Sequence, residues 1–262
     1  MKKFIISIIL ALVVLWFLKP FNIVILGSDA RPWQPLKGSR SDSIMLINVN
    51  PLLAKIKIVS IPRDSYTPID CEKNGKTDKI THALAFGGSA CSVRALENML
   101  NTKIQYHVLL RFEDVINITT LVGGVDIISN HTFTQDGQSF VKGKAYNIEG
   151  ERALAYARHR KTDSDYKRGD RQKQIFSGLQ AKVISPSGFS KIPSILAYCK
   201  EHMEIRFNPL RFISMLPAIA IHGSNYETFE LEGDGKMMKG VWYFIPDQNS
   251  LKKIKKEFKV WI

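Results

Sequence analysis

Hydrophobic residues are distributed differently on the two sides of residue 20. Lys2 and Lys3 precede an uncharged, largely apolar run over residues 4–18, which ends at Lys19 and Pro20. As a helix this run rises about 22 Å, and snorkelling of the flanking lysines can close the difference from a hydrocarbon core of roughly 30 Å. No small-x-small cleavage pattern follows it. We therefore expect residues 1–20 to be an uncleaved signal anchor, a single transmembrane helix, with residues 21–262 as an extracytoplasmic domain.

Beyond residue 20, short apolar runs alternate with segments of helical spacing. The expected strands are 22–27, 43–50, 55–62, 105–111, 125–128, 227–231 and 241–245. The expected helices are 79–86, 92–100, 112–121, 149–158, 168–184, 191–199, 209–220 and a last Lys-rich helix for which Asp247 is the N-cap. The first two strands are apolar on both faces, and no repeat or linker divides the chain. These patterns predict one α/β domain, a central mixed β-sheet with helices on both faces.

Composition narrows the classes of ligand. The chain has 262 residues, 45% of them hydrophobic, and a formal net charge of +13. That charge favours anionic ligands, whether nucleic acid, anionic lipid or a phosphorylated molecule. An exported domain does not meet nucleic acid, and no helix-turn-helix or basic-zipper pattern occurs, so we expect no nucleic-acid partner. The six histidines show no metal-ligand spacing, and we expect neither zinc nor a serine-hydrolase triad.

Outside the cytoplasm, cysteines can oxidise. Cys71 and Cys91 flank a loop that a disulfide could close, leaving Cys199 unpaired. The alternative is that all three are small buried hydrophobic residues, and the sequence leaves both interpretations open.

Charged residues gather where the predicted strands end. If the second and third strands form a hairpin, Asp42 faces Arg63 at its open end. Asp29 leaves the C-terminal end of the first strand, the edge where open α/β sheets usually bind ligands, so Asp29, Arg40, Asp42, Arg63 and Asp64 are expected on one rim. Two carboxylates beside arginines suit a Mg²⁺ site for a pyrophosphate. The alternative is a cross-strand ion pair between Asp42 and Arg63 with no further role.

A basic stretch, ARHRKTDSDYKRGDRQKQ, spans residues 157–174. If Arg168 begins a helix, then Arg168, Arg171 and Gln172 project from one face of its first turn, where the helix dipole is positive and an anion is favoured. Arg158 and Arg160 can reach the same place, and the planar fork of arginine suits phosphate oxygens. The alternative is a solvated basic face balanced by neighbouring aspartates.

Several blocks together carry a family resemblance. They are ILGSDAR, GSRSDSIMLINVNP, VSIPRDSY, DKITHALAFGG, LVGGVDI, NIEGERALAYARHRKTDSDYKRGDRQKQ and LEGDGKMMKGVWYFIPD. In this order they resemble the LytR-CpsA-Psr family, from about residue 22 to the C-terminus. The resemblance implies a membrane-anchored phosphotransferase that moves a glycopolymer, such as teichoic acid or capsular polysaccharide, from a polyprenyl-pyrophosphate carrier to a muramic-acid 6-hydroxyl of peptidoglycan. It also implies a mixed sheet with an apolar pocket for the prenyl chain.

The resemblance also implies roles for individual residues. Asp29 and Asp42 resemble the carboxylates that hold Mg²⁺, or alternatively Mn²⁺, against the pyrophosphate, and one of them can assist deprotonation of the acceptor. Arg63 resembles the arginine beside the scissile phosphate. The residues that match pyrophosphate-gripping positions are Arg40, Lys79, Arg158, Arg160, Arg168, Arg171 and Gln172.

Three other functions remain as alternatives. A polyprenyl-pyrophosphate phosphatase would use the same residues with water as the acceptor, a membrane-bound transcriptional attenuator would use the positive charge, and a lipid- or glycan-binding protein would need no catalysis. The chain also has almost no linker after Leu18. From this we expect the active site to lie close to the membrane.

Overall fold

A mixed six-stranded sheet organises the domain in this computed structural model, which describes residues 2–31, 33–36, 38–71, 75–159, 165–183, 185–208, 210–211, 213–215 and 226–260. The strands, in spatial order, are β11 (Glu204–Arg206), β6 (Tyr106–Arg111), β1 (Phe21–Ser28), β2 (Ser41–Asn50), β3 (Lys55–Ser60) and β12 (Glu227–Glu230). β1 pairs with β6, and β3 with β12, in parallel; the other pairs are antiparallel. The predicted mixed sheet is confirmed.

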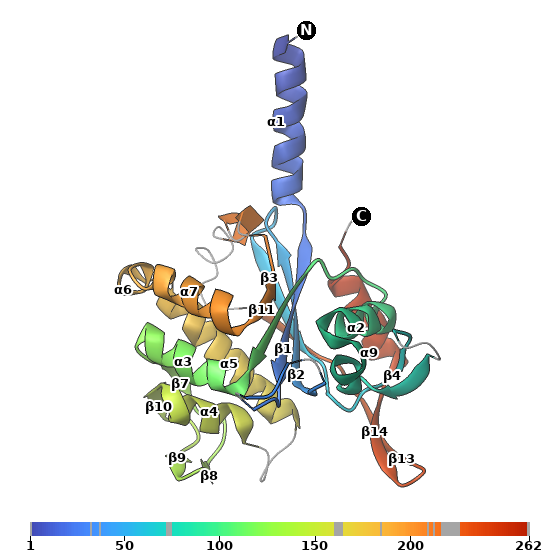
Figure 1. Cartoon of the computed structure of the whole chain (residues 1–262), viewed down its shortest axis with the longest axis vertical. Helices are drawn as coiled ribbons and strands as arrows, with labels where there is room; N and C mark the ends of the chain where they lie inside the picture. Colours follow the sequence, from blue (N-terminus) through green and yellow to red (C-terminus); the bar gives the residue numbers. More distant parts are fainter. Residues whose placement is uncertain are drawn as a thin grey trace.

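Helices cover both faces of this sheet (Figure 1). On one face lie α2 (His82–Leu100) and α9 (Gln248–Glu257), whose apolar side chains pack with Val24, Leu46 and Val59 of the central strands. On the other face lie α5 (Asp165–Val183) and, beyond it, α3 (Phe112–Val122), α4 (Gly150–Arg158), α6 (Pro186–Phe189) and α7 (Ile192–His202). Alternate residues of the same strands, such as Met45 and Ile47, pack on that side. Successive side chains of a strand point to opposite faces of the sheet. Because a hydrophobic core lies on each face, the central strands need apolar residues at nearly every position.

Among the described residues, four two-stranded sheets lie around the central one. They are β4 (Tyr66–Ile69) with β5 (Lys76–Lys79), β7 (Val125–Ile128) with β10 (Ala145–Ile148), β8 (Phe133–Gln135) with β9 (Gln138–Phe140), and β13 (Gly233–Met238) with β14 (Val241–Pro246). The expected strands at 125–128 and 241–245 therefore exist, but outside the central sheet. Their partners carry little strand signal in the sequence, because β10 (AYNI) has only four residues and β13 (GDGKMM) contains two glycines.

Two helix predictions need correction at their first residues. The two segments expected at 79–86 and 92–100 are the two parts of α2, which lie on either side of a kink where Gly87 and Gly88 are not helical. The first part begins at His82 and not at Lys79, because Lys79 ends β5. The helix expected from Arg168 begins three residues earlier, at Asp165, because an aspartate is favourable at the positive end of a helix. Most of the helix expected at 209–220 lies outside the described residues. The predicted N-cap is confirmed, since the Asp247 carboxylate accepts hydrogen bonds from the amides of Asn249 and Ser250.

The N-terminal helix α1 (Lys2–Leu18) projects away from the domain, and its apolar side chains are exposed (Figure 1). No helix among the described residues combines the length and the hydrophobicity needed to cross a membrane.

The structure decides between the two interpretations of the cysteines, a disulfide or three free thiols. Cys71, after β4, and Cys91, in α2, form a disulfide with their Cα atoms 5.5 Å apart. Cys199 carries a free thiol, and burial, helped by the nearby Asp114 carboxylate, raises the pKa of that thiol.

Candidate functional site

The predicted hairpin register brings Asp42 and Arg63 together. β2 and β3 pair from Asn50↔Lys55 to Met45↔Ser60, and continuing that register beyond the last pair aligns Asp42 with Arg63. Nη1 of Arg63 lies 2.7 Å from Oδ1 of Asp42, and both side chains are less than a quarter exposed. The cross-strand ion pair is therefore confirmed.

This pair continues into a chain of alternating charges. Nε of Arg63 lies 3.6 Å from Oδ2 of Asp64, and Nζ of Lys79 lies 2.8 Å from Oδ1 of Asp64. Lys79 is the last residue of β5. The chain just after it is bonded to Arg63, since the Thr81 amide donates to the Arg63 carbonyl at 3.0 Å, and this brings Lys79 close to Asp64. Arg63 is thus held between two carboxylates, with its guanidinium in a defined orientation.

Asp29 lies on the loop that joins β1 to β2. Its Oδ1 accepts a hydrogen bond from the Arg40 amide at 2.8 Å, and its own amide donates to the Arg40 carbonyl at 3.1 Å. These two bonds close the loop at its base and orient the exposed Asp29 carboxylate. The side chain of Arg40 is exposed to solvent.

The first turns of α5 pack directly on the ends of β2 and β3. Nη2 of Arg168 donates to the Asp42 carbonyl at 3.2 Å, and the Ser43 hydroxyl donates to Oε1 of Gln172 at 2.6 Å. Gly169 permits this approach, since a Cβ there would lie 3.0 Å from Oγ of Ser60. Arg168 and Gln172 therefore belong to the rim at the strand ends.

Arg171 does not share that position, contrary to the expectation of one common face. Its side chain is fully buried and turns toward α4, donating to the His159 carbonyl at 2.6 Å and to Oδ1 of Asn130 at 3.4 Å. It also lies over the Phe133 ring. The physical reason is that α5 is sandwiched between the sheet and the α4 side, so residues one turn apart meet different partners. Arg160 lies outside the described residues.

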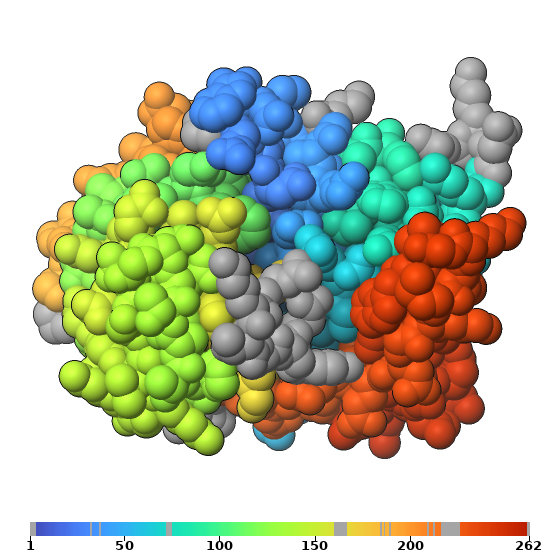
Figure 2. All heavy atoms as spheres, turned by 90° about the horizontal axis from the view of Figure 1, so that it is seen from below, coloured from blue at the N-terminus to red at the C-terminus, as the bar shows by residue number. Residues whose placement is uncertain are grey.

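A charged cavity of about 380 Å³ opens at this rim. It is lined by five predicted residues, Asp29, Asp42, Arg158, Arg168 and Gln172, and also by Arg31, Phe112, Glu113 and Ala157. Arg31 and Glu113 were not predicted. Arg31 is two residues after Asp29 in the ILGSDAR block, so its position in the sequence could have identified it as a site residue. Glu113 belongs to the start of α3, and only the fold brings it near the rim. Figure 2 shows this end of the domain, opposite α1, with the β1–β2 loop, the β8–β9 hairpin and the β13–β14 hairpin around its centre.

An apolar cavity of about 120 Å³ adjoins the charged one. It lies between the sheet and helices α3 and α5, and most of its lining is aliphatic or aromatic: Ile25, Met45, Leu110, Val115, Ile175, Phe176 and Leu179. Phe112, Ala157 and Gln172 line both cavities. The two cavities are therefore neighbours that share a wall, one polar and one apolar.

Asp29 and Asp42, two of the three carboxylates that line the charged cavity, suit a magnesium ion. Among the described residues, no group of three or more His, Cys, Asp or Glu side chains is arranged to hold a metal. Mg²⁺ does not need such a group, because it is usually bound by one or two carboxylates and completes its octahedron with water and substrate phosphate oxygens. Asp29 and Asp42 line one cavity and supply oxygen donors of that kind.

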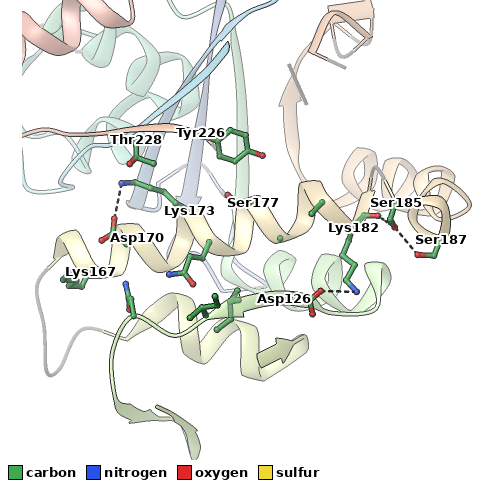
Figure 3. A pocket seen from close by; sticks show the side chains of 16 residues that line it. Asp126, Lys167, Asp170, Lys173, Ser177, Lys182, Ser185, Ser187, Tyr226 and Thr228 are labelled. Atoms are coloured by element: carbon green, nitrogen blue, oxygen red, sulfur yellow. Dashed lines mark hydrogen bonds and ion pairs between the residues drawn. The ribbon is translucent and has the colours of Figure 1, made fainter. Parts of the chain in front are cut away.

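A larger cavity, of about 920 Å³, lies on the opposite side of α5 (Figure 3). Its lysines are largely matched by carboxylates, since Nζ of Lys173 lies 3.2 Å from Asp170 and Nζ of Lys182 lies 3.7 Å from Asp126. Burial raises the pKa of Tyr226, which also lines it. The rim carboxylates Asp29 and Asp42 do not contribute to this cavity. We therefore place the functional site at the rim, despite the smaller volume there.

The rim lies at the far end of the sheet from α1, contrary to the expectation that the site is close to the membrane. α1 ends at Leu18, β1 begins at Phe21, and Asp29 follows the last residue of β1. An eight-residue strand is about 26 Å long. The distance between the site and α1 is therefore set by the length of β1, although the linker between α1 and β1 is short.

The chain is thus a mixed α/β domain whose strand ends carry paired carboxylates and arginines beside an apolar cavity. The LytR_cpsA_psr family model matches residues 17–260, and the chain belongs to this family.

Named relatives agree with this assignment. A polyisoprenyl-teichoic acid–peptidoglycan teichoic acid transferase TagU of Bacillus cereus is 39% identical over 233 residues, which cover 87% of this chain and 75% of that protein. The crystal structure of B. subtilis TagV matches with a TM-score of 0.78 and 30% identity, covering 92% of this chain and 96% of that one. The structure of TagT bound to LIIa-WTA matches with a TM-score of 0.74 and 29% identity, covering 92% and 90%.

Proposed function

We propose that this chain is a phosphotransferase that moves a glycopolymer, of the teichoic acid or capsular polysaccharide type, from a polyprenyl-pyrophosphate carrier to peptidoglycan. One observation carries the proposal: the charged and apolar cavities share Phe112, Ala157 and Gln172. A ligand in which a pyrophosphate is joined to a hydrocarbon chain has the same division into polar and apolar parts. The names of the TagU relatives, which are teichoic acid transferases, support the same reaction.

The transfer forms one bond and breaks another at phosphorus. The acceptor hydroxyl oxygen bonds to the sugar-linked phosphorus, the bridging oxygen leaves with the prenyl phosphate, and the product is a phosphodiester. Such reactions depend mainly on positioning and on neutralising the charge of non-bridging oxygens. Arg63 is held in place by Asp42 and Asp64 for this purpose, and Arg158 and Arg168 add positive charge around the cavity. Arg40, Arg63 and Lys79 are not among the residues that line the cavity: the Arg40 backbone is bonded to Asp29, Arg63 is paired with Asp42, and Lys79 is paired with Asp64. Asp29 or Asp42 accepts the proton of the acceptor.

Asp29 and Asp42 are the residues that would hold Mg²⁺, or Mn²⁺ in its place. The bound ion would neutralise part of the charge on the pyrophosphate oxygens. The ion pair of Asp42 with Arg63 would keep this carboxylate aligned whether or not the ion is present.

The apolar cavity is the place for the first isoprene units next to the pyrophosphate. At about 120 Å³ it is smaller than ordinary ligand pockets of roughly 300–1,000 Å³. Lipid binding therefore requires side chains such as Phe176 to move away from Met45, which widens the space between α5 and the sheet.

The proposed location is the cell membrane, with α1 as the single span and the domain outside. α1 is apolar, projects from the domain and begins at Lys2, which suits a short helix with lysines at both ends (Figure 1). Its 17 residues rise about 26 Å, a few ångströms less than a typical hydrocarbon core. The Cys71–Cys91 disulfide also supports an oxidising, extracytoplasmic environment.

The test is transfer by the full chain in phospholipid vesicles. A polyprenyl-pyrophosphate glycan, Mg²⁺ and peptidoglycan oligomers are added, and the sugar is followed by mass spectrometry. We expect a phosphodiester-linked adduct that is lost in Asp42→Asn and Arg63→Ala and kept in Arg94→Ala, which removes an exposed arginine of α2. Release of prenyl phosphate and phosphorylated sugar alone would establish the phosphatase instead, and lipid binding without turnover would establish a carrier.

A further inference from the structure

The end of the domain opposite the rim is joined to α1 by a buried arginine. Arg211 is 2% exposed, and its guanidinium donates to the carbonyl oxygens of Trp16, Phe17 and Lys19, with a distance of 2.9 Å to Phe17. It also lies over the Phe21 ring, 4.3 Å from its centroid. The last carbonyls of a helix lack partners within the helix. Here Arg211 supplies these carbonyls with hydrogen-bond donors, so the end of α1 is bonded directly to the domain.

The turn between β2 and β3 lies beside this junction. Phe21, the first residue of β1, pairs with Val49 near the end of β2, so the turn at residues 51–54 extends past the start of β1. The turn reads Pro-Leu-Leu-Ala. Leu52 is 65% exposed and Leu53 is 59% exposed. Turns facing water are usually built from Gly, Asn, Asp, Ser and Pro, so two adjacent exposed leucines at a hairpin tip are unusual.

A second pair of exposed aliphatic residues flanks Arg211. Leu210 is 57% exposed and Ile213 is 50% exposed. Since Arg211 contacts the last carbonyls of α1, Leu210 and Ile213 lie at the same end of the domain as the Leu52–Leu53 turn. Exposed apolar side chains that gather on one surface mark an interaction site.

The length of α1 decides what this surface meets. As an anchor, α1 rises about 26 Å, which is slightly less than the thickness of a hydrocarbon core of roughly 30 Å. Only Lys19 and Pro20 separate α1 from β1. With so little slack, and with Arg211 holding the helix to the domain, the turn at residues 51–54 reaches the level of the lipid headgroups. The exposed basic residue at this junction, Lys19, suits that level as well.

We propose that Leu52 and Leu53, together with Leu210 and Ile213, form a membrane-docking surface that enters the interface of the bilayer in which α1 is anchored. This inference rests on the proposed membrane anchoring of the chain. Docking keeps the sheet upright on the membrane, so the rim with Asp29 and Asp42 stays about 26 Å from the surface, the length of β1. The site then faces the acceptor on the outside, while the prenyl chain follows the sheet from the membrane.

Spin labels in the full chain test the docking directly. Leu53→Cys is labelled in a Cys199→Ser background and reconstituted into vesicles of zwitterionic and anionic phospholipids. The matched control is Met237→Cys, which replaces an apolar residue that is 62% exposed on the β13–β14 hairpin at the other end of the domain (Figure 1). We expect the label at 53 to be relaxed by oxygen, which concentrates in lipid, and protected from a water-soluble nickel chelate, with the reverse at 237.

Two outcomes would overturn the proposal. Equal exposure of both labels to the nickel chelate would show that the turn stays in water. Protection of the label at 53 from both reagents would show that a protein surface, such as a second copy of this chain, covers the turn instead of lipid.

A rate measurement separates docking from the chemistry. We expect the double substitution Leu52→Asn and Leu53→Asn to slow transfer from a vesicle-embedded donor about tenfold, since it removes two apolar side chains from the interface, and to leave transfer from a short-chain soluble donor unchanged. Equal losses with both donors, or no loss with the vesicle donor, would contradict the inference. If the unsubstituted chain used neither donor, the proposed function would fail, while the spin labels would still decide the docking.

Discussion

Arg63→Ala is the substitution whose consequences the structure defines most fully. It removes the guanidinium that lies 2.7 Å from Asp42 and 3.6 Å from Asp64. Asp64 keeps Lys79 at 2.8 Å, so Asp42 is the carboxylate that loses its cation. Because these groups are partly exposed, we expect the free energy of unfolding to fall by only about 1 kcal/mol. The rate of transfer should fall about 10²- to 10³-fold, the usual effect of removing one preorganised donor that faces developing charge.

The assay measures transfer and stability on the same preparations. Arg63→Lys, which keeps the charge but loses the planar fork, should fall between the wild type and Arg63→Ala. Asp42→Asn and the double variant complete a cycle. If Asp42 acts by aligning Arg63, the double variant should lose about as much activity as the more damaging single variant, because residues that act as a unit are not additive. Arg94→Ala is the control for loss of a positive charge elsewhere.

Two results would refute the reasoning. A folded Arg63→Ala protein with less than a tenfold loss of transfer would remove Arg63 from the mechanism. Losses that multiply fully in the double variant would show that Asp42 and Arg63 act independently, and their ion pair would then have no positioning role.

Three further predictions concern packing and cysteine chemistry. Gly169→Ala places a Cβ 3.0 Å from Oγ of Ser60, which should shift α5 from the rim and slow transfer about tenfold, with partial rescue by Ser60→Gly. Opening the Cys71–Cys91 disulfide should remove about 3 kcal/mol and lower Tm by roughly 6–12 °C, measured with and without reductant. Because burial raises the pKa of Cys199, its alkylation should be slow at pH 8, accelerate as pH rises past the ordinary thiol value, and become fast on unfolding.

Each of these has an opposite outcome that would count against it. Normal transfer by Gly169→Ala would mean that the contact with Ser60 relaxes at no cost to the site. An unchanged Tm after reduction would mean that the unfolded chain gains little freedom when the Cys71–Cys91 loop opens. Alkylation of the folded protein at the rate of a small thiol would show that Cys199 is accessible and unperturbed.

The sequence was informative wherever structure depends on neighbours along the chain. Short apolar runs rich in Ile and Val identify β1, β2 and β3, and the short turn between β2 and β3 sets their register, so the Asp42–Arg63 ion pair follows from local rules. The Asp247 N-cap is of the same kind, because a cap contacts amides two and three residues away. The family motifs extended this reading to residues for which spacing alone left alternatives.

Only the tertiary structure decided which of the charged residues meet. Arg171 is one helical turn from Arg168, yet it is buried against His159, because α5 packs between two layers and each side of the helix meets a different one. Lys79 reaches Asp64 because β5 pairs with β4, a pairing that the sequence did not indicate. The rim and α1 lie at opposite ends of the sheet because β1 runs its full length between them. Contacts of this kind join residues far apart in the chain, so they depend on how whole elements pack and are not encoded in any short stretch.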